Sequence, residues 1–158
     1  PDGRLLAAAS DRRLLVRDAE TLKLVQVFIC LERIERLVWS PDSAYILAEI
    51  AKQSLVQVWS AHDAEWQCRI DEGRAGLAHS FWAPSSRHVL VVTDFQLYLS
   101  VWPLQDAARP TRIRGPKYSH RGAAFSRSGG QLLAVLRRAD CRDSVSVHDC
   151  EAGHAELV

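Results

Sequence analysis

Short apolar runs separated by turns recur along this chain, and their order returns about every 43 residues. In the clearest copy, four runs follow one another: Leu37–Ser40, Tyr45–Ile50, Leu55–Trp59 and Trp66–Ile70. The second run is almost continuously apolar, as a strand buried on both faces should be, whereas the third and fourth partly alternate between apolar and polar residues. The pattern therefore predicts four short β-strands in each copy.

Two recurring features mark the period. A turn rich in Pro, Ser, Asp and Gly follows the first run, at Pro41–Ser43, Pro84–Ser86, Ser126–Gly129 and, at the start of the chain, Pro1–Gly3. The third run ends in a Val and two further residues: Val16-Arg17-Asp18, Val58-Trp59-Ser60, Val101-Trp102-Pro103 and Val147-His148-Asp149. The last residues of these triplets are 42, 43 and 46 positions apart. A repeat of this length, filled with strands and turns, predicts the blades of a β-propeller.

The period divides the chain into about three and a half blades. No segment carries the 3.6-residue apolar stripe of a helix, so we expect an all-β fold of four-stranded antiparallel blades. The expected boundaries are 1–30 for an incomplete blade, then 31–73, 74–117 and 118–158, the last with its fourth strand cut short. Because the chain opens inside a copy and contains no Met, we expect it to be part of a longer protein.

The turn and the closing residues resemble those of the WD40 repeat. That family has a Ser-Pro-Asp-Gly turn after the first strand and Trp-Asp at the end of the third, as in Ser40-Pro41-Asp42-Ser43, Trp59-Ser60 and His148-Asp149 here. The Gly-His pair that often accompanies them is missing. The resemblance therefore implies blades held mainly by apolar packing, with four bulky fillers: Trp39, Trp59, Trp82 and Trp102.

Four further segments resemble the WRAP family of centrosomal WD-repeat proteins. They are Gly3–Ala7, Leu55–Ser60, Glu65–Leu77 and Arg137–Asp143, and they include positions that WD repeats do not share in general. This resemblance implies a protein of the cytoplasm and cytoskeleton, at the centrosome and spindle pole. It implies work in microtubule anchoring, spindle assembly and cilium formation. The implied partners are a centrosomal microtubule-anchoring adaptor and a minus-end-directed kinesin.

Composition favours a globular protein outside the membrane. The chain is 47% hydrophobic and 25% charged with a formal net charge of +1, and no apolar run approaches the roughly 18–20 residues of a membrane span. No secretory leader is recognisable at its start. Four cysteines lie far apart, without a Cys-x-x-Cys pair, which favours a reducing, intracellular compartment.

No motif indicates catalysis. The chain shows no nucleophile elbow, no His-Glu-x-x-His and no Gly-rich phosphate loop. His148 stands where the repeat has its Trp, so we expect a packed strand residue there. Cys141 and Cys150 with His148 and His154 fit no structural zinc spacing. We therefore expect no enzyme activity, cofactor, metal or small-molecule substrate.

Basic residues gather in one stretch. From Arg109 to Arg127 there is no acidic residue, and six residues are basic: Arg109, Arg112, Arg114, Lys117, Arg121 and Arg127. The ordinary interpretation of this strip is the solvated face of an outer strand. The alternative is a contact with an acidic protein segment or with nucleic acid. For nucleic acid only Tyr118 and Phe125 offer aromatic rings nearby, so that partner is the weaker alternative.

Two places are predicted contacts for a protein partner. The first is a charged loop between the second and third strands of the last blade, expected to be longer than its counterparts, with Arg137, Arg138, Asp140 and Arg142. The second is Trp66 at the start of an outer strand. The bland interpretations are a self-paired hairpin for the first and a cover for the blade edge for the second.

The terminal blades are expected to make the isolated chain prone to association. Each would present an apolar face that a neighbouring blade normally covers, and large faces of this kind drive association. We therefore expect the isolated chain to oligomerise or to be poorly soluble.

Overall fold

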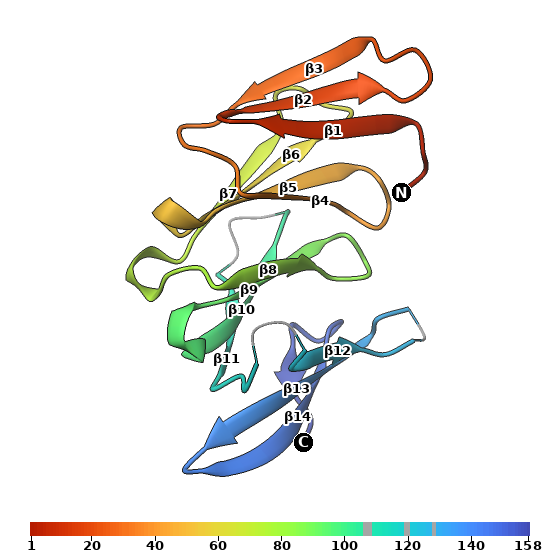
Figure 1. Cartoon of the computed structure of the whole chain (residues 1–158). Helices are drawn as coiled ribbons and strands as arrows, with labels where there is room; N and C mark the ends of the chain where they lie inside the picture. The colour runs from red at the N-terminus through yellow and green to blue at the C-terminus, as the bar shows by residue number, and fades with distance from the viewer. Residues whose placement is uncertain (106–108, 119–120, 128) are drawn as a thin grey trace. The chain divides into compact units, whose positions relative to one another are not determined.

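The computed structural model describes residues 1–105, 109–118, 121–127 and 129–158, and its contacts divide the chain into two units, Pro1–Arg74 and Ala75–Val158. Each unit contains two antiparallel sheets, drawn in chain order in Figure 1. The predicted all-β propeller architecture is confirmed: three sheets have four strands and the first has three. The helices of the described residues are single 3-10 turns at Ala51–Gln53, Gly73–Ala75 and Asp94–Gln96.

Unit 1 is built from two meanders. The first sheet has the order β1-β2-β3 and the second the order β4-β5-β6-β7, so that consecutive strands are always neighbours. The strands are β1 (Leu5–Ser10), β2 (Arg13–Asp18), β3 (Leu24–Ile29), β4 (Arg36–Trp39), β5 (Tyr45–Ile50), β6 (Leu55–Ser60) and β7 (Gln67–Asp71). The first sheet thus has three strands and the second has four.

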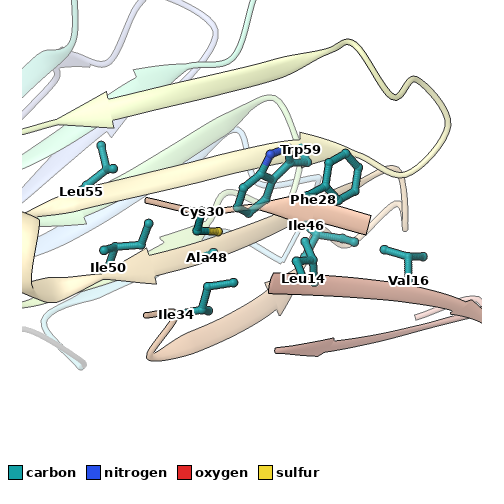
Figure 2. Packing of buried hydrophobic residues seen from close by; sticks show 10 residues of the cluster. All are labelled: Leu14, Val16, Phe28, Cys30, Ile34, Ile46, Ala48, Ile50, Leu55 and Trp59. Carbon is teal, nitrogen blue, oxygen red and sulfur yellow. The ribbon is translucent and has the colours of Figure 1, made fainter. Parts of the chain in front are cut away.

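The core of unit 1 lies between these two sheets, where side chains of β2 and β3 meet those of β5 and β6 (Figure 2). Leu14 on β2 and Ile46 on β5 have no exposed surface. The Trp59 ring stacks on Phe28 with centroids 5.4 Å apart. Trp59 is 2% exposed, so this predicted filler is confirmed. Of the other three, Trp82 is also buried, whereas Trp39 and Trp102 are half-buried.

The opposite face of the first sheet is apolar but uncovered. Leu6, Val27 and Ile29 are 49%, 40% and 77% exposed. Leu6 follows Pro1 by the same number of residues as Ile46 follows Pro41, yet Ile46 is fully buried. The same repeat position is thus covered in the second sheet and open in the first, because the described residues of unit 1 form no further sheet on this face of β1–β3.

Unit 2 repeats the arrangement with sheets β11-β10-β9-β8 and β12-β13-β14-β15. The strands are β8 (His79–Trp82), β9 (His88–Val92), β10 (Tyr98–Pro103), β11 (Thr111–Arg114), β12 (Ala123–Phe125), β13 (Leu132–Ala139), β14 (Arg142–Asp149) and β15 (Ala155–Glu156). Its core joins Leu90, Val92 and Leu99 of one sheet to Leu133 and Val135 of the other. Each unit therefore has an apolar core of its own.

The predicted turn after the first strand takes a defined form in the second sheet. The Ser40 hydroxyl donates to Asp42 Oδ1 at 2.6 Å and accepts from the Tyr45 N–H at 2.9 Å. Ser43 takes the Gly position of the family turn with φ of 63°, a left-handed conformation that costs a residue with a Cβ some strain. In the fourth copy, Ser128 lies outside the described residues.

The prediction of a charged loop at Arg137–Asp143 is wrong. β13 and β14 are eight residues each, and only Asp140 and Cys141 separate them, with φ of 49° and 61° (Figure 1). Two consecutive left-handed residues form the type I′ turn that closes a twisted hairpin tightly. Arg137 and Arg138 therefore lie on β13, while Arg142 begins β14. The extra residues lengthen the strands, not the loop.

Candidate protein-interaction surface

The basic strip and the long hairpin lie side by side in unit 2. After β11, the chain runs along the part of β13 that the short β12 strand leaves unpaired. The Lys117 N–H donates to the Leu136 carbonyl at 2.8 Å, and the Arg138 N–H donates to the Gly115 carbonyl at 2.8 Å. Pro116 forms a bridge opposite Arg137. The structure thus joins two groups of predicted contact residues into one surface, which we call the hairpin surface: Arg112, Arg114, Lys117, Arg137, Arg138, Asp140, Arg142 and Asp143.

Asp143 connects the two parts of the hairpin surface. Its carboxylate accepts hydrogen bonds from Lys117 Nζ and from Arg138 Nε, the latter at 2.9 Å across the hairpin. The hydrogen bond from Arg138, followed by that from Lys117, lowers the pKa of Asp143. Its carboxylate correspondingly raises the pKa of Lys117. One carboxylate shared by two cations leaves this part of the surface positive.

Arg137 occupies a different place, facing the neighbouring sheet of unit 2. Its Nε donates to the Arg114 carbonyl at 2.9 Å, and its Nη1 forms an ion pair with Glu156 Oε1 at 2.9 Å. Arg137 and Glu156 border a pocket of about 280 Å³ between β11 and the β14–β15 pair. Also lining it are Thr111, Ile113, His148 and His154.

Two buried histidines form part of this pocket's wall. His148 is 3% exposed, and its Nδ1 lies 3.3 Å from the His154 carbonyl, which can only accept a hydrogen bond. Nδ1 therefore carries a proton, and Nε2 forms a hydrogen bond with the Ser146 hydroxyl at 2.9 Å. The expectation of a packed strand residue at His148 is confirmed. His154 is 5% exposed, and its Nε2 has no hydrogen-bond partner among the described residues.

Burial makes His154 a pH-dependent part of the fold. Desolvation, followed by the nearby His88 and His148, lowers the pKa of His154 to about 4. A group with a depressed folded-state pKa binds fewer protons in the native state, so its contribution is fully present above about pH 6.5 and is lost toward pH 4. We expect unfolding free energy to fall by about 1–3 kcal/mol over this range, less in His154→Leu. Urea unfolding at both pH values measures it.

The exposed His62 of unit 1 supplies the control, because His62→Leu removes a histidine without removing a buried one. The pH dependence of that variant should equal that of the unchanged protein. An equal loss of stability in His154→Leu and in the unchanged protein would show that other groups carry the effect.

The remaining predicted contact residues lie apart from the pocket. Arg142 is exposed at the start of β14 and makes no ion pair with another described residue, and Asp140 is exposed in the turn. Arg109, Arg121 and Arg127 are exposed, while positions 119 and 120 of the strip lie outside the described residues. In unit 1, Trp66 is half-buried and tilted against the Tyr45 ring with centroids 4.9 Å apart. Trp66 thus covers the side chain that begins β5.

No group of three or more His, Cys, Asp or Glu side chains in the described part of the chain is placed to hold a metal ion. Helices long and apolar enough for a membrane span are likewise missing from it. A larger hollow in unit 2, about 470 Å³, lies beside His88, Gln131 and Glu151.

Comparison with known proteins agrees with the family that the repeat indicates. No family model matches the chain. The mouse (Mus musculus) WD repeat-containing protein WRAP73 is 44% identical over 150 residues, which is 95% of this chain. The chain belongs to the WD-repeat family. It spans 32% of the length of the mouse WD-repeat protein.

Solved structures agree with this WD-repeat fold. The hydrazine synthase of Kuenenia stuttgartiensis matches with a TM-score of 0.62 at 19% identity, over 100% of this chain and 46% of that one. The dihydro-heme d1 dehydrogenase NirN matches with a TM-score of 0.65 at 21% identity, over 100% of this chain and 34% of its own. At such identities the likeness shows the fold alone. The WD-repeat similarity supports a protein-interaction scaffold.

The sequence does not indicate Glu156 as a site residue, and it places His154 only in a group that fits no zinc spacing. Glu156 is an ordinary surface residue by type, and only the short β15 strand brings it to Arg137. His154 carries no motif, and its burial depends on the packing between the two sheets of unit 2. The cross-strand spacing of Arg138 and Asp143 was the one signal that could have indicated a paired hairpin.

Proposed function

We propose that this chain is part of a non-catalytic scaffold that binds other proteins at the centrosome and spindle pole, in the cytoplasm and cytoskeleton. Its work there is microtubule anchoring, spindle assembly and cilium formation. The partners we propose are a centrosomal microtubule-anchoring adaptor and a minus-end-directed kinesin. The support for the place and the partners is the resemblance of four segments to the centrosomal WRAP family.

The single observation that carries the scaffold role is the hairpin surface. A long hairpin is fixed by two backbone hydrogen bonds, one that the Gly115 carbonyl accepts from Arg138 and one that the Lys117 N–H donates to Leu136. Such a hairpin is a rigid platform, and rigid platforms lose little entropy on binding. The sequence of unit 2 holds ten basic and seven acidic residues, a formal net charge of +3. Arginines on a fixed surface are favoured contact residues in protein interfaces. Trp66 remains a second proposed contact.

Proximity labelling of the intact protein in dividing cells tests this function. We expect enrichment of centrosomal anchoring proteins, and a fall of about fivefold or more when Arg137, Arg138 and Arg142 are all replaced by Ala, since hot-spot losses reach 1–2 kcal/mol or more. The matched control replaces three exposed arginines of unit 1, Arg4, Arg12 and Arg69, by Ala. This control should label as the unchanged protein does.

The outcomes separate the parts of the proposal. Enrichment that both triple variants leave unchanged keeps the scaffold and removes the hairpin surface from it. Recovery of RNA-bound or chromatin complexes would instead favour a nucleic-acid-associated WD-repeat subunit that binds through the strip from Arg109 to Arg127. In that case affinity for nucleic acid should fall steeply as salt rises.

A further inference from the structure

We infer that the pocket beside Arg137 binds a glutamate or aspartate side chain from an acidic segment of a partner protein, and that Glu156 fills this place in the free protein. The inference rests on the proposed function, since it names the chemistry of a partner that the scaffold receives. Five observations carry it: the fixing of Arg137, the loose hold on Glu156, the charge of the pocket, the unsatisfied His154 and the lining of the pocket.

Arg137 is fixed by contacts that are independent of Glu156. Its Nε donates to the Arg114 carbonyl at 2.9 Å, and its backbone forms a bridge with Pro116. The side chain is 27% exposed, with Nη1 directed to a carboxylate. A planar guanidinium held in one orientation matches the geometry of a carboxylate and loses little freedom when it binds one. The site is therefore ready for an acidic side chain.

Glu156 is held much less firmly than Arg137. It belongs to β15, a strand of two residues, and its side chain is 51% exposed. An ion pair between partly exposed groups contributes little free energy, because water solvates and screens both charges. A partner segment that brings several carboxylates can thus replace Glu156 at small cost. The carboxylate of Glu156 thus indicates that the pocket binds a carboxylate.

The charges around the pocket favour an anion. Arg112 and Arg114 line it together with Arg137, against the single carboxylate of Glu156. The Arg112 guanidinium lies 4.8 Å from the centre of the Tyr98 ring, and this cation–π contact restrains the side chain. Several basic groups on one fixed wall raise the local concentration of acidic segments.

His154 adds a group that the protein leaves unsatisfied. Its imidazole lines the same pocket, is 5% exposed, and has no partner for Nε2 in the described part of the chain. A buried polar atom without a hydrogen bond is costly. A small shift of this side chain that lets Nε2 donate to a carboxylate in the pocket would therefore be favoured.

The lining of the pocket favours a peptide over nucleic acid. Among the described residues that border it there is no Phe, Tyr or Trp on which a base could stack. Thr111 and Ile113 instead offer a hydroxyl and an apolar wall suited to a side chain and its methylene groups. We therefore expect discrimination for a carboxylate on a short stem.

Fluorescence anisotropy with the intact protein tests the inference. The probe is a fluorescein-labelled peptide of alternating Glu and Gly, and its counterpart carries Gln in place of every Glu. We expect the acidic peptide to bind and the Gln peptide not to bind. The acidic peptide should bind Arg137→Gln about fivefold more weakly, which is the upper end for an ion pair between partly exposed groups. Glu156→Gln should bind about threefold more tightly, since it removes the weak competing ion pair.

Matched variants separate the pocket from general charge. Arg87→Gln and Glu151→Gln make the same charge changes at residues that line the other hollow of unit 2 and do not line this pocket. Each should alter affinity by less than about twofold. Equal effects of Arg137→Gln and Arg87→Gln, or of Glu156→Gln and Glu151→Gln, would overturn the inference. So would tighter binding of polyuridylate or of a phosphoserine peptide with the same dependence on Arg137.

The two proposals fail in different ways. Loss of the inference leaves proximity labelling by the intact protein unchanged, because the scaffold could bind through another face. Failure of the scaffold proposal abolishes centrosomal labelling even where the acidic peptide still binds the purified protein and responds to Glu156→Gln. Glu156→Gln is the safer of the two variants, since it changes one half-exposed side chain that contributes little to folding.

Discussion

Replacing Trp59 with Ala is expected to lower the unfolding free energy by about 3–5 kcal/mol, which is the cost of emptying a large buried aromatic site. Trp59 is 2% exposed and stacks on Phe28 in the core of unit 1 (Figure 2). Because the family's usual His–Trp network has no Gly-His pair to support it here, apolar packing carries this blade. Urea unfolding followed by circular dichroism measures the loss.

Trp66 provides the matched control for this substitution. Trp66→Ala removes the same side chain from a half-buried place against Tyr45, and should cost about 1 kcal/mol. Equal losses for Trp59→Ala and Trp66→Ala would contradict the view that the packing between the sheets of unit 1 holds this unit together.

The open face of the first sheet is expected to make the purified chain associate. Leu6 and Ile29 are large and exposed, and each lies opposite an arginine in the register, Arg17 and Arg13 respectively. The double variant Leu6→Glu with Ile29→Glu places carboxylates beside these arginines and removes the apolar face. We expect the concentration at which half of the chain is associated to rise about tenfold or more, equivalent to about 1.4 kcal/mol.

Sedimentation velocity over a range of protein concentrations checks this expectation. Phe95→Glu is the control, because Phe95 is 94% exposed on a 3-10 turn and belongs to no apolar sheet face. A chain that stays monomeric, or a double variant that associates like the unchanged chain, would contradict the role given to this face.

Most of the fold could be predicted because the repeat states the same pattern several times. The predicted strand at Tyr45–Ile50 coincides with β5, and that at Leu55–Trp59 differs from β6 by one residue. Apolar continuity in the second strand and partial alternation in the third follow directly from how many faces each strand buries. A pattern that burial enforces can be found in the sequence alone.

The hairpin could not be predicted in the same way. Five of the seven residues of Arg137–Asp143 are charged. The segment therefore shows no alternation of buried and exposed positions and resembles a loop by composition. What holds it extended is cross-strand pairing of Arg138 with Asp143 and backbone bonding to Gly115. The second contact depends on where the chain passes after β11, which no local pattern encodes. Joining the strip to the hairpin therefore required the structure.

The tight turn at the tip of this hairpin has a consequence for comparing related sequences. Asp140 and Cys141 both hold positive φ values, so the residues found there are restricted by backbone conformation, with Asn, Asp and Gly preferred. A side chain that stays constant at this tip would then report on the bend of the chain. Constant side chains on the two strands, such as Arg137 and Arg142, would instead indicate contact with a partner, because their backbone conformation does not restrict the residue type.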